Sequence, residues 1–468
     1  MTQLDPAIFR TYDIRGIVDQ DITEENIYWI GKALGSLVRE QSDDSIIIAR
    51  DGRLSSPTLS TALSDGILST GCHVIDLGRT PTPLLYYGAY VLDSLTTANS
   101  TKKYSGVMLT GSHNPANYNG LKIVIQGQTL AEEGIKNLYQ RIVEKNFQTG
   151  EGKRQTYDIT QHYIHHITNH VQLTRPLKIV VDAGNGVAGD IAPALFRALG
   201  CEVIELYCDI DGRFPHHHPD PSQPENLLDL IHSVKENQAD IGLAFDGDGD
   251  RLGVVTQKGD MIYPDRLLML FTKMILAKHQ QAKIIFDVKC TNHLPALIQS
   301  LGGQPIMWKT GHSLIKAKMA ETQALLAGEM SGHFFFKDRW YGFDDALYAG
   351  ARLLEIIANQ DQSSDELFST IPNSVNTPEL KVLVAEEEKF SLMEKLIAQA
   401  HFKEAEDVMT IDGLRVNFSH GWGLVRPSNT TPCLVLRFEA INEIILNDIK
   451  TSFRQWMLSV KPDLVLPF

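Results

Sequence analysis

The chain of 468 residues is about three domains long at ~150 residues per domain, which excludes a single small binding module. Apolar residues make up 43% and charged residues 21%, which excludes a disordered, collagen-like or coiled-coil chain. The 43 Lys and Arg against 57 Asp and Glu give a net charge of -14, and a field of that sign repels nucleic acid and acidic lipid surfaces. We therefore expect no nucleic acid and no membrane as a partner, and a local basic pocket for any anionic ligand.

The N-terminal residues and the cysteines indicate the compartment. Residues 1–10 include Asp5 and Pro6 and have no apolar segment of the kind that a secretion signal needs, and no run approaches ~18 uninterrupted apolar residues. The 5 cysteines are an odd number without a CxxC pair, which is typical of free thiols in a reducing cytosol. We expect a cytoplasmic protein.

One pattern of predicted strands and helices is repeated three times along the chain. It opens with a run rich in Ile and Val, at residues 45–51, 178–184 and 283–289, and such runs indicate buried strands. Each run is followed by a helical stretch, a second strand after a glycine, a second helical stretch, and a third apolar run that enters a polar glycine-rich loop. Strands that alternate with helices need crossover connections, so each unit is expected to hold a mainly parallel sheet covered by helices on both faces.

After about residue 371 the pattern changes to a helical stretch, closely spaced strands and a final helix, which indicates a smaller α+β domain. The predicted domains are residues 1–155, 156–258, 259–371 and 372–468. Ligands of such sheets gather where strands end and loops begin. We therefore expect four domains around a shared central cleft.

Three carboxylates, Asp246, Asp248 and Asp250, directly follow the apolar run IGLAF and are separated by single glycines. Carboxylates this close repel one another unless a cation neutralises them, and the glycines allow the curvature that aims all three inward. Oxygen ligands at this density suit Mg²⁺ with an open position for a phosphate oxygen. An EF-hand loop is excluded because Arg251 stands where the turn glycine is needed and Gln257 replaces the bidentate Glu. A solvated acidic turn, and a phosphatase with Asp246 as nucleophile, stay open.

A second motif places Ser112 between Gly111 and His113 at the end of the apolar run GVML. A hydroxyl in this position can stand clear of the sheet and react. The alternative is that Ser112 only caps a helix or a turn. A hydrolase nucleophile elbow is excluded because Asn114 occupies the second glycine position of G-x-S-x-G.

Two more polar loops have the composition of a sugar-phosphate site. GEMSGH, at residues 328–333, carries Glu329, Ser331 and His333, and carboxylate and hydroxyl groups suit hydrogen bonds to sugar hydroxyls. RPSNTTP, at residues 426–432, offers a guanidinium followed by hydroxyl, amide and turn N–H groups, which together can form a nest for phosphate. Each loop taken alone is also compatible with an ordinary polar turn.

A glycine pattern, GxGxxG at Gly184, Gly186 and Gly189, follows a strand as it does in dinucleotide-binding proteins. The equivalent turns of the other two units read ARDGRLSS and DVKCTNHL, without that pattern. We interpret these glycines as the turn of a repeated scaffold, with nucleotide binding as the alternative.

The set of loops resembles the α-D-phosphohexomutase family, and within it the phosphomannomutase/phosphoglucomutase group. The similarity spans nearly the whole chain, with YDIRG at residues 12–16, TGSHNP at 110–115, DGDGDR at 246–251, KTGHS at 309–313, then GEMSGH and RPSNTTP in the expected order. The resemblance implies three similar mixed, mainly parallel α/β domains plus a C-terminal α+β domain like the TATA-binding protein. It also implies reversible conversion of mannose or glucose 1-phosphate and 6-phosphate through a phosphoserine enzyme and a hexose 1,6-bisphosphate intermediate.

The resemblance further implies residue roles, carried over motif by motif. Ser112 is expected to be phosphorylated and, with Asp246, Asp248 and Asp250, to hold the metal. Catalytic roles in charge stabilisation and proton transfer are expected for Arg15, Lys122, Arg251 and His333. Substrate contacts are expected for Tyr12, Lys289, Gly311, His312, Glu329, Ser331, Arg426, Ser428, Asn429 and Thr430.

The cofactors implied by the resemblance are Mg²⁺ and, as activator, glucose 1,6-bisphosphate or mannose 1,6-bisphosphate. The expected partners are hexose phosphates, and the expected assembly is a monomer or a dimer. Glucose and mannose differ only at carbon 2, so a site that binds hydroxyls 3 and 4 should accept both sugars. Three rival functions stay open: a Mg²⁺-dependent phosphatase, a sugar-phosphate binder without activity, and a phosphoglucosamine mutase, against which Met330 favours the hexose group.

Overall fold

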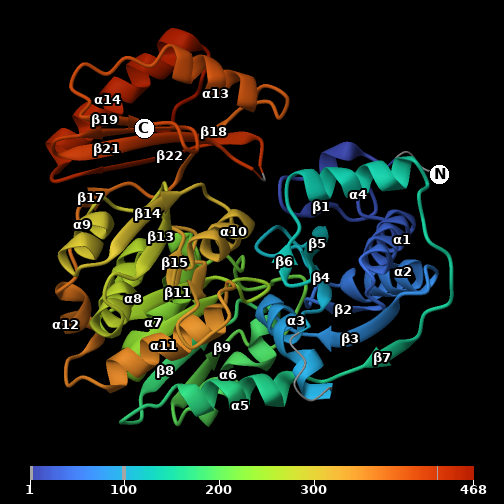
Figure 1. Cartoon of the computed structure of the whole chain (residues 1–468). Coiled ribbons are helices and arrows are strands. Elements are labelled where there is room, and N and C mark those ends of the chain that lie inside the picture. Colours follow the sequence, from blue (N-terminus) through green and yellow to red (C-terminus); the bar gives the residue numbers. More distant parts are fainter. Residues whose placement is uncertain (1–3, 97–101, 430) are drawn as a thin grey trace.

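The computed structural model of the chain describes residues 4–96, 102–429 and 431–468. Four sheets follow one another along the chain. Figure 1 shows the first unit, in blue, beside the second and third units, with the C-terminal unit, in red, packed against the third. Four units arranged in this way confirm the fold class predicted from the sequence.

The first sheet has seven strands, of which the four neighbours β4, β2, β3 and β7 are parallel. Its order is β1 (Ile14–Ile17), β5 (Tyr118–Ile125), β4 (Ser105–Leu109), β2 (Ser45–Arg50), β3 (His73–Arg79) and β7 (Arg154–Thr156), with β6 (Gln128–Thr129) on β5. Strand β2 is buried on both faces: Ile46 and Ile48 pack under α1 (Glu24–Glu40), α2 (Ser56–Leu68) and α4 (Glu133–Val143), whereas Ile47 packs under α3 (Thr82–Thr96). This two-sided burial explains the continuous run of isoleucines in the sequence.

The second and third sheets repeat this design. The second has the order β12 (Met261–Ile262), β11 (Leu252–Thr256), β10 (Ile241–Phe245), β8 (Lys178–Asp182) and β9 (Glu202–Leu206), with α5 (Thr160–His170), α6 (Ala192–Ala198) and α7 (Leu228–Asn237). The third has the order β14 (Gln304–Trp308), β13 (Lys283–Asp287), β15 (Leu326–Gly328) and β16 (Phe334–Phe336), with α8 (Pro264–Lys278), α9 (His293–Ser300), α10 (His312–Thr322), α11 (Ala346–Ala358) and α12 (Ser364–Ser369). One hydrophobic core, which includes α11, runs through all three units and fixes them against one another.

Each of the three units contains, after its third predicted strand, a hairpin that the sequence analysis did not predict. The antiparallel pairs are β4–β5, β10–β11 and β15–β16. Their turns are the polar loops that were predicted to carry the site. The second sheet also includes β12, which lies beyond the boundary predicted at residue 258. The hairpins matter for function because the returning strand β5 carries Lys122 back to the loop that holds Ser112.

The C-terminal unit is an antiparallel sheet covered on one face by α13 (Lys389–Ala398) and α14 (Glu443–Val460). Its order is β17 (Val375–Asn376), β22 (Cys433–Ala440), β21 (Gly421–Pro427), β20 (Leu414–Phe418) and β19 (Asp407–Met409), with β18 (Leu380–Leu383) also on β22. This agrees with the predicted α+β domain. The motif RPSNTTP begins with the last two residues of β21, and β22 follows it in the chain.

The other face of this sheet is joined to the third unit by apolar packing and by buried polar contacts. Trp422 and Leu424 pack on Val288. Arg437, 1% exposed, forms an ion pair with Asp265 of α8 at 2.8 Å. Arg415 Nη1 donates a hydrogen bond to the carbonyl oxygen of Cys290 at 2.9 Å.

None of the helices in the described ranges is long and apolar enough to cross a membrane. All five cysteines lie buried as free thiols, as their spacing predicted.

We expect the change Arg437→Ala to lower the free energy of unfolding by about 3–5 kcal/mol, because it leaves the Asp265 carboxylate buried without its partner. The matched change Arg213→Ala removes an exposed ion pair with Asp211 and should leave stability almost unchanged. Thermal unfolding of the two variants beside the wild type measures the difference, and equal shifts in both variants would contradict this account of the interface.

Candidate active site

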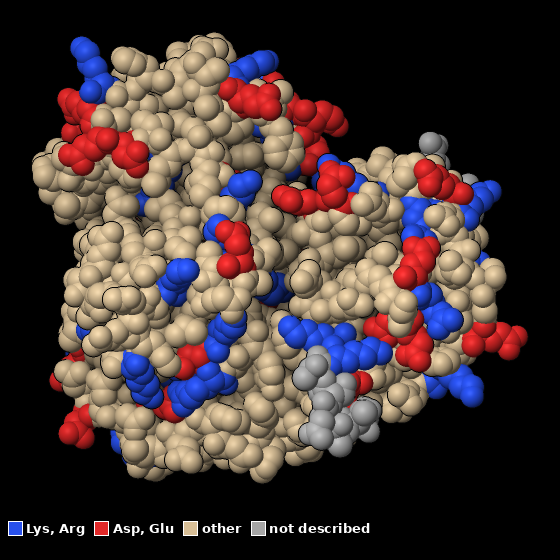
Figure 2. Space-filling view, viewed as in Figure 1, with Lys and Arg blue, Asp and Glu red and all other residues tan. Residues whose placement is uncertain are grey.

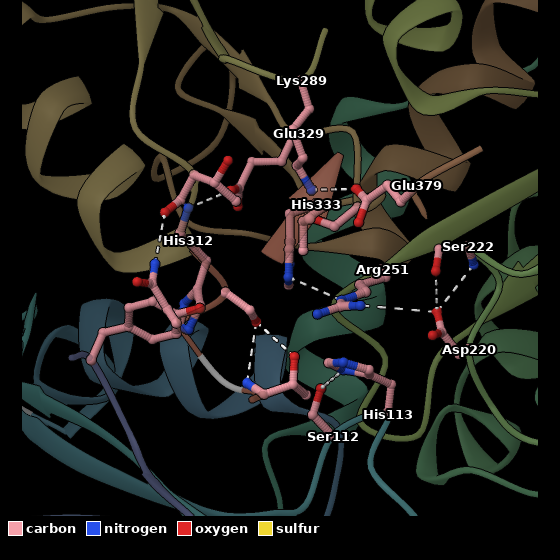
Figure 3. Close-up of a pocket in the computed structure, with 18 of the residues that line it drawn as sticks. Ser112, His113, Asp220, Ser222, Arg251, Lys289, His312, Glu329, His333 and Glu379 are labelled. Carbon is pink, nitrogen blue, oxygen red and sulfur yellow. Dashed lines mark hydrogen bonds and ion pairs between the residues drawn. The ribbon is translucent and has the colours of Figure 1, made fainter. Parts of the chain in front are cut away.

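Loops from all four units meet at one central cleft, shown in Figure 3. Strands β4, β10 and β15 end at this cleft, which is why their loops converge. The cleft is lined by these predicted residues: Tyr12, Arg15, Ser112, Lys122, Arg251, Lys289, Gly311, His312, Glu329, Ser331, His333, Arg426, Ser428 and Asn429. Thr430 lies outside the described residues.

Ser112 is held in a strained and closely defined position after β4. Its φ of 49° lies in the left-handed region, which residues other than glycine rarely adopt. The backbone N–H donates to Thr110 Oγ1 at 2.8 Å, and the carbonyl oxygen accepts from Arg53 Nη2 at 2.8 Å. The hydroxyl of Ser112 donates to Asp246 Oδ2 at 3.1 Å, so it bonds to the acidic loop of another unit and does not cap its own turn.

The acidic loop lies between β10 and β11 and is buried. Asp246, Asp248 and Asp250 have no exposed surface, and one carboxylate oxygen of each lies within 4.8 Å of those of the others. Gly249 has a φ of 76°, and a Cβ on Gly247 would lie 2.4 Å from the carbonyl oxygen of Ser112. Complete burial shows that the alternative of a solvated acidic turn is wrong, and the glycines are required for curvature and close approach.

The charge of the three carboxylates is only partly balanced by protein groups. Lys122 Nζ lies 2.6 Å from Asp248 Oδ2 and also contacts Asp250. Burial, and then the charges of Asp248 and Asp250, raise the pKa of Asp246 well above its ordinary value. Burial alone would lower the pKa of Lys122, but the adjacent carboxylates outweigh it and the pKa of Lys122 is raised.

Two oxygens of this cluster, Oδ1 of Asp248 and Oδ1 of Asp250, are buried and have no hydrogen-bond partner among the described residues. Unsatisfied buried carboxylate oxygens are costly, and hard oxygen donors are the ligands that Mg²⁺ prefers. The donor set therefore fits a magnesium ion.

The geometry disfavours Asp246 as a phosphatase nucleophile. Its Oδ1 accepts hydrogen bonds from the backbone N–H groups of Asp250 at 3.0 Å and Arg251 at 3.1 Å. Its Oδ2 accepts from Ser112, which lines the cleft. A nucleophile needs an oxygen that can reach the substrate, and here the hydroxyl of Ser112 occupies that position.

Cationic side chains gather near Ser112 although the chain as a whole is acidic. Arg15 donates from Nη2 to Asp13 at 2.6 Å, whereas its buried Nε and Nη1 atoms have no partner among the described residues. Arg251 Nη1 lies 3.9 Å from Asp220 Oδ1. Guanidinium groups with free donors in a buried site are suited to bind phosphate oxygens. This is the local basic pocket expected from the net charge.

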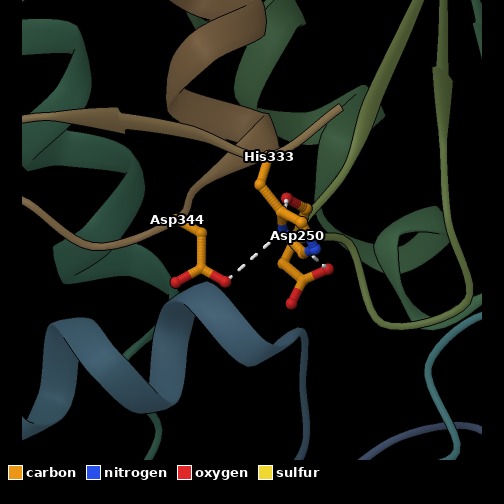
Figure 4. A group of neighbouring side chains, drawn as sticks. All are labelled: Asp250, His333 and Asp344. Carbon is orange, nitrogen blue, oxygen red and sulfur yellow. Dashed lines mark hydrogen bonds and ion pairs between the residues drawn. The ribbon is translucent and has the colours of Figure 1, made fainter. Parts of the chain in front are cut away.

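His333 is fixed as a neutral imidazole. Its Nδ1 lies 3.1 Å from the carbonyl oxygen of Asp250 and must donate to it, and its Nε2 accepts from Arg251 Nε at 3.1 Å. Burial, and then the nearby charge of Arg251, lower the pKa of His333 well below its ordinary value. Asp344, which the sequence analysis missed, lies 3.4 Å from His333 Nδ1. Figure 4 shows the two side chains facing each other.

On the opposite side of Figure 3 from Ser112, Glu329 and Lys289 face the cleft. Glu329 Oε1 accepts from the backbone N–H of Gly311 at 2.6 Å, and its buried Oε2 has no partner among the described residues. Lys289 Nζ lies 2.5 Å from Glu379 Oε1. Burial, and then the charge of Asp287, raise the pKa of Glu329 to about 8.

The C-terminal unit supplies a second group of anion donors. Arg426 Nε donates to Asp412 at 2.9 Å, and its buried Nη2 has no partner among the described residues. Ser428 Oγ lies 2.7 Å from Thr431 Oγ1, and Asn429 Nδ2 donates to the carbonyl oxygen of Thr310 at 3.5 Å. The cleft thus has one group of anion donors beside Ser112 and another on the fourth unit.

Several residues of the cleft were not found from the sequence. The cleft is also lined by His113, Asp220, Ser222, Gln223, Thr310, Glu379, Lys381, Thr431 and Val435. Arg53, behind the loop, donates to the carbonyl oxygens of Ser112, Asn114, Pro115 and Tyr118. The motif ARDGR at the end of β2 could have identified Arg53 as a residue that supports the site. A charged side chain at the end of a buried strand needs hydrogen-bond or ion-pair partners.

The glycine pattern at residues 184–189 belongs to the scaffold. A Cβ on Gly186 would lie 3.0 Å from Gly247, and a Cβ on Gly189 would lie 2.0 Å from the carbonyl oxygen of Cys208. Val187 N–H donates to the carbonyl oxygen of Gly247 at 3.1 Å. The turn therefore packs against the acidic loop, in the place where a dinucleotide pyrophosphate would have to bind.

Comparison with known proteins gives the same assignment for all four units. The models of phosphoglucomutase/phosphomannomutase alpha/beta/alpha domains I, II and III match residues 6–149, 161–259 and 263–375, and the model of the C-terminal domain matches residues 379–455. The chain is 54% identical over 465 residues to a phosphomannomutase/phosphoglucomutase of Pseudomonas aeruginosa, covering 99% of this chain and 98% of that protein. It is 48% identical over 470 residues to a phosphoglucomutase of Neisseria meningitidis, with both chains covered completely.

A solved structure of a phosphoglucomutase/phosphomannomutase family protein from Burkholderia thailandensis superimposes with a TM-score of 0.94 at 52% identity, covering 100% of both chains. The matches reach from the first unit to the last and include every loop of the cleft. The chain belongs to the phosphoglucomutase/phosphomannomutase family, as the resemblance of its loops predicted.

Proposed function

We propose that this protein interconverts the 1-phosphates and 6-phosphates of mannose and glucose, through phosphorylated Ser112 and a hexose 1,6-bisphosphate. The observation that carries the proposal is the 3.1 Å hydrogen bond from Ser112 Oγ to Asp246 Oδ2, which brings a hydroxyl of the first unit to the acidic loop of the second. Phosphoryl transfer depends mainly on positioning and on neutralising charge; this contact supplies the positioning, and the cations that line the cleft can supply the positive charge.

The proposed cofactor is Mg²⁺, held by Asp246, Asp248, Asp250 and the phosphorylated Ser112. When bound, it would supply positive charge beside the phosphoryl group. The support is the donor set: three buried carboxylates, two of which have an oxygen without a partner among the described residues. A hexose 1,6-bisphosphate, of glucose or mannose, is the proposed activator because it can phosphorylate a Ser112 that has lost its phosphate.

In the proposed forward step, the free hydroxyl oxygen of a hexose phosphate forms a bond to the phosphorus while the bond from phosphorus to Ser112 Oγ breaks. Arg15, Lys122 and Arg251 surround this position and are proposed to stabilise the charge of the transferring group. The hydroxyl proton must leave, and Lys122 and His333 are the proposed proton carriers. His333 Nε2 carries no proton but accepts a hydrogen bond from Arg251 Nε, so this bond must open before Nε2 can take the hydroxyl proton.

In the return step, the bisphosphate turns over within the cleft and gives its other phosphate to Ser112 Oγ. The phosphate that does not react is proposed to bind Arg426, Ser428, Asn429 and Thr430. Recognition must work in both orientations, and Glu329 and Ser331 achieve this if they bind the 3- and 4-hydroxyls, which roughly exchange places when the sugar turns over. Tyr12, Lys289, Gly311 and His312 are proposed to contact the same sugar. The site would then accept the hydroxyl at carbon 2 in either configuration.

The domain boundaries at residues 155, 258 and 371, the cytoplasmic location and the monomeric or dimeric state stay predictions.

Substrate range is tested by ³¹P NMR with mannose 1-phosphate, glucose 1-phosphate and glucosamine 1-phosphate, each with Mg²⁺ and a trace of glucose 1,6-bisphosphate. We expect 6-phosphate to form from mannose and glucose at comparable rates and slowly from glucosamine. Net release of inorganic phosphate would contradict the proposal and indicate a phosphatase.

We expect Ser112→Ala to lower turnover by roughly 10³-fold or more, because the oxygen that carries the phosphoryl group is lost. Binding of hexose phosphate, measured by calorimetry, should persist because Arg15 and Arg426 are unchanged. A variant that keeps a near-normal mutase rate would refute the role of Ser112. Loss of turnover together with loss of binding would instead indicate that the loop has collapsed.

The raised pKa of Glu329 predicts a dependence of stability on pH. Its carboxyl has a pKa of about 8 in the folded protein and 4.5 as its ordinary value, so folding favours the protonated form between these values. Because the folded pKa is the higher one, this contribution is fully present below pH 4.5 and is lost as pH rises through about 8.

We expect the free energy of unfolding of the wild type to fall with rising pH more steeply than that of Glu329→Gln, by up to about 1.4 kcal/mol for each pH unit across this range. Glutamine has the same shape and cannot titrate, so the difference between the two profiles reports this carboxyl alone. Thermal unfolding between about pH 5 and pH 9 measures both profiles. Parallel profiles would show that Glu329 is ionised throughout.

A further inference from the structure

A second cavity lies between the first and third units and shares no lining residue with the central cleft among the described residues. Its walls come from α3, the β5–β6 hairpin, α10 and residues 337–343. Its volume is about 610 Å³, within the range of small-molecule sites. In Figure 2, blue Lys and Arg side chains gather around the hollow between the first and third units.

The charge of this cavity is opposite to that of the chain. Lys103, Lys316 and Lys337 line it, and none of the described residues that line it is acidic. The ammonium of Lys103 lies 4.5 Å from the ring centroid of Tyr90, and that of Lys337 donates to the amide oxygen of Gln323 at 2.5 Å. Lys103 and Lys337 have no acidic partner among the described residues, whereas Lys316 is paired with Asp344. In a protein with a net charge of -14, this local excess of positive charge suits an anionic ligand.

Two buried hydroxyl groups in the wall of the cavity have no hydrogen-bond partner among the described residues. They are Tyr86 OH and Ser313 Oγ, on residues that are 2% and 3% exposed. An unsatisfied buried hydroxyl is costly, so each of these groups can form a hydrogen bond with a molecule that fills the cavity.

An aromatic wall completes the cavity. Tyr90, Tyr341 and Phe343 line it together with Tyr86 and Trp340. The rings of Tyr341 and Phe343 are nearly parallel, with an interplanar angle of 5°. The ring of Tyr90 contacts both in a tilted orientation. Such a surface suits a flat ring.

We propose that this cavity binds a phosphate ester with an aromatic ring, of the nucleoside monophosphate class. The phosphate would lie among Lys103, Lys316 and Lys337, and the base would pack on the wall formed by Tyr90, Tyr341 and Phe343. A hexose phosphate satisfies the cations but leaves the aromatic wall uncovered, which is why the structure favours the aromatic ligand.

Lys316 connects the cavity to the central cleft. Its ammonium lies 3.9 Å from the ring centroid of Tyr86 and 2.8 Å from Asp344 Oδ1. The other oxygen of Asp344 lies 3.4 Å from His333 Nδ1. A phosphate that draws Lys316 toward the cavity leaves Asp344 without its counter-charge beside His333. This consequence rests on the proposed function, and it predicts a lower kcat with an unchanged KM.

Calorimetric titration of the wild type with GMP and UMP, in the presence of saturating hexose phosphate to fill the central cleft, tests the binding. We expect one site, with affinity for GMP at least about 10-fold higher than for guanosine or inorganic phosphate alone. The double variant Lys103→Ala/Lys337→Ala should weaken binding about 10-fold, or ~1.4 kcal/mol, because both cations are lost. The control Lys318→Ala, on the same helix but paired with Glu321, should bind as the wild type does.

Absence of binding, competition with hexose phosphate, or equal affinity in wild type and double variant would overturn the site. Thermal unfolding confirms that the variants are folded. The link to turnover is tested separately by measuring kcat with and without GMP. We expect GMP to lower kcat of the wild type, and the double variant to resist it at the same GMP concentration. Binding without any change in kcat would support the site and overturn the connection through Lys316.

Discussion

Three carboxylates buried in one tight loop set the conditions for the rest of this structure. Like charges in a water-free interior repel strongly, so Asp246, Asp248 and Asp250 can stay ionised only if other groups reach them. Lys122 and Ser112 do so from the first unit, across the boundary between units. The acidic loop of the second unit therefore depends on the hairpin of the first, and the remaining negative charge calls for a metal cation.

The hydroxyl of Ser112, the proposed phosphoryl carrier, is also firmly held. Arg53 donates to four carbonyl oxygens of the loop around Ser112, and the strained backbone at Ser112 persists because these contacts define it. A phosphoryl group on a fixed oxygen needs little further positioning, which is the main contribution that proteins make to this chemistry. The sugar is proposed to contact groups of other units, and its proposed reorientation requires that these contacts can be made in two orientations.

Much of the fold and of the site could be predicted from the sequence because both depend on local patterns. Isoleucine runs buried on two faces identified the strands, and polar loops at strand ends identified Ser112, the acidic triplet and the loop of Glu329. Residues that act through distant contacts left no such pattern. Asp344 and Asp220 are single acids in ordinary segments, and they gain meaning only when folding brings them to His333 and Arg251. The second cavity could not be predicted because its walls come from segments of two units.

The central claim is that the acidic triplet and phosphorylated Ser112 share one metal ion. The most direct measurement is ³¹P electron-nuclear double resonance on one equivalent of Mn²⁺ bound to the phosphorylated protein. The account predicts a ³¹P coupling that disappears after dephosphorylation while Mn²⁺ stays bound, and weakened Mn²⁺ binding in Asp248→Asn. Tightly bound Mn²⁺ without ³¹P coupling in the phosphorylated protein would contradict it.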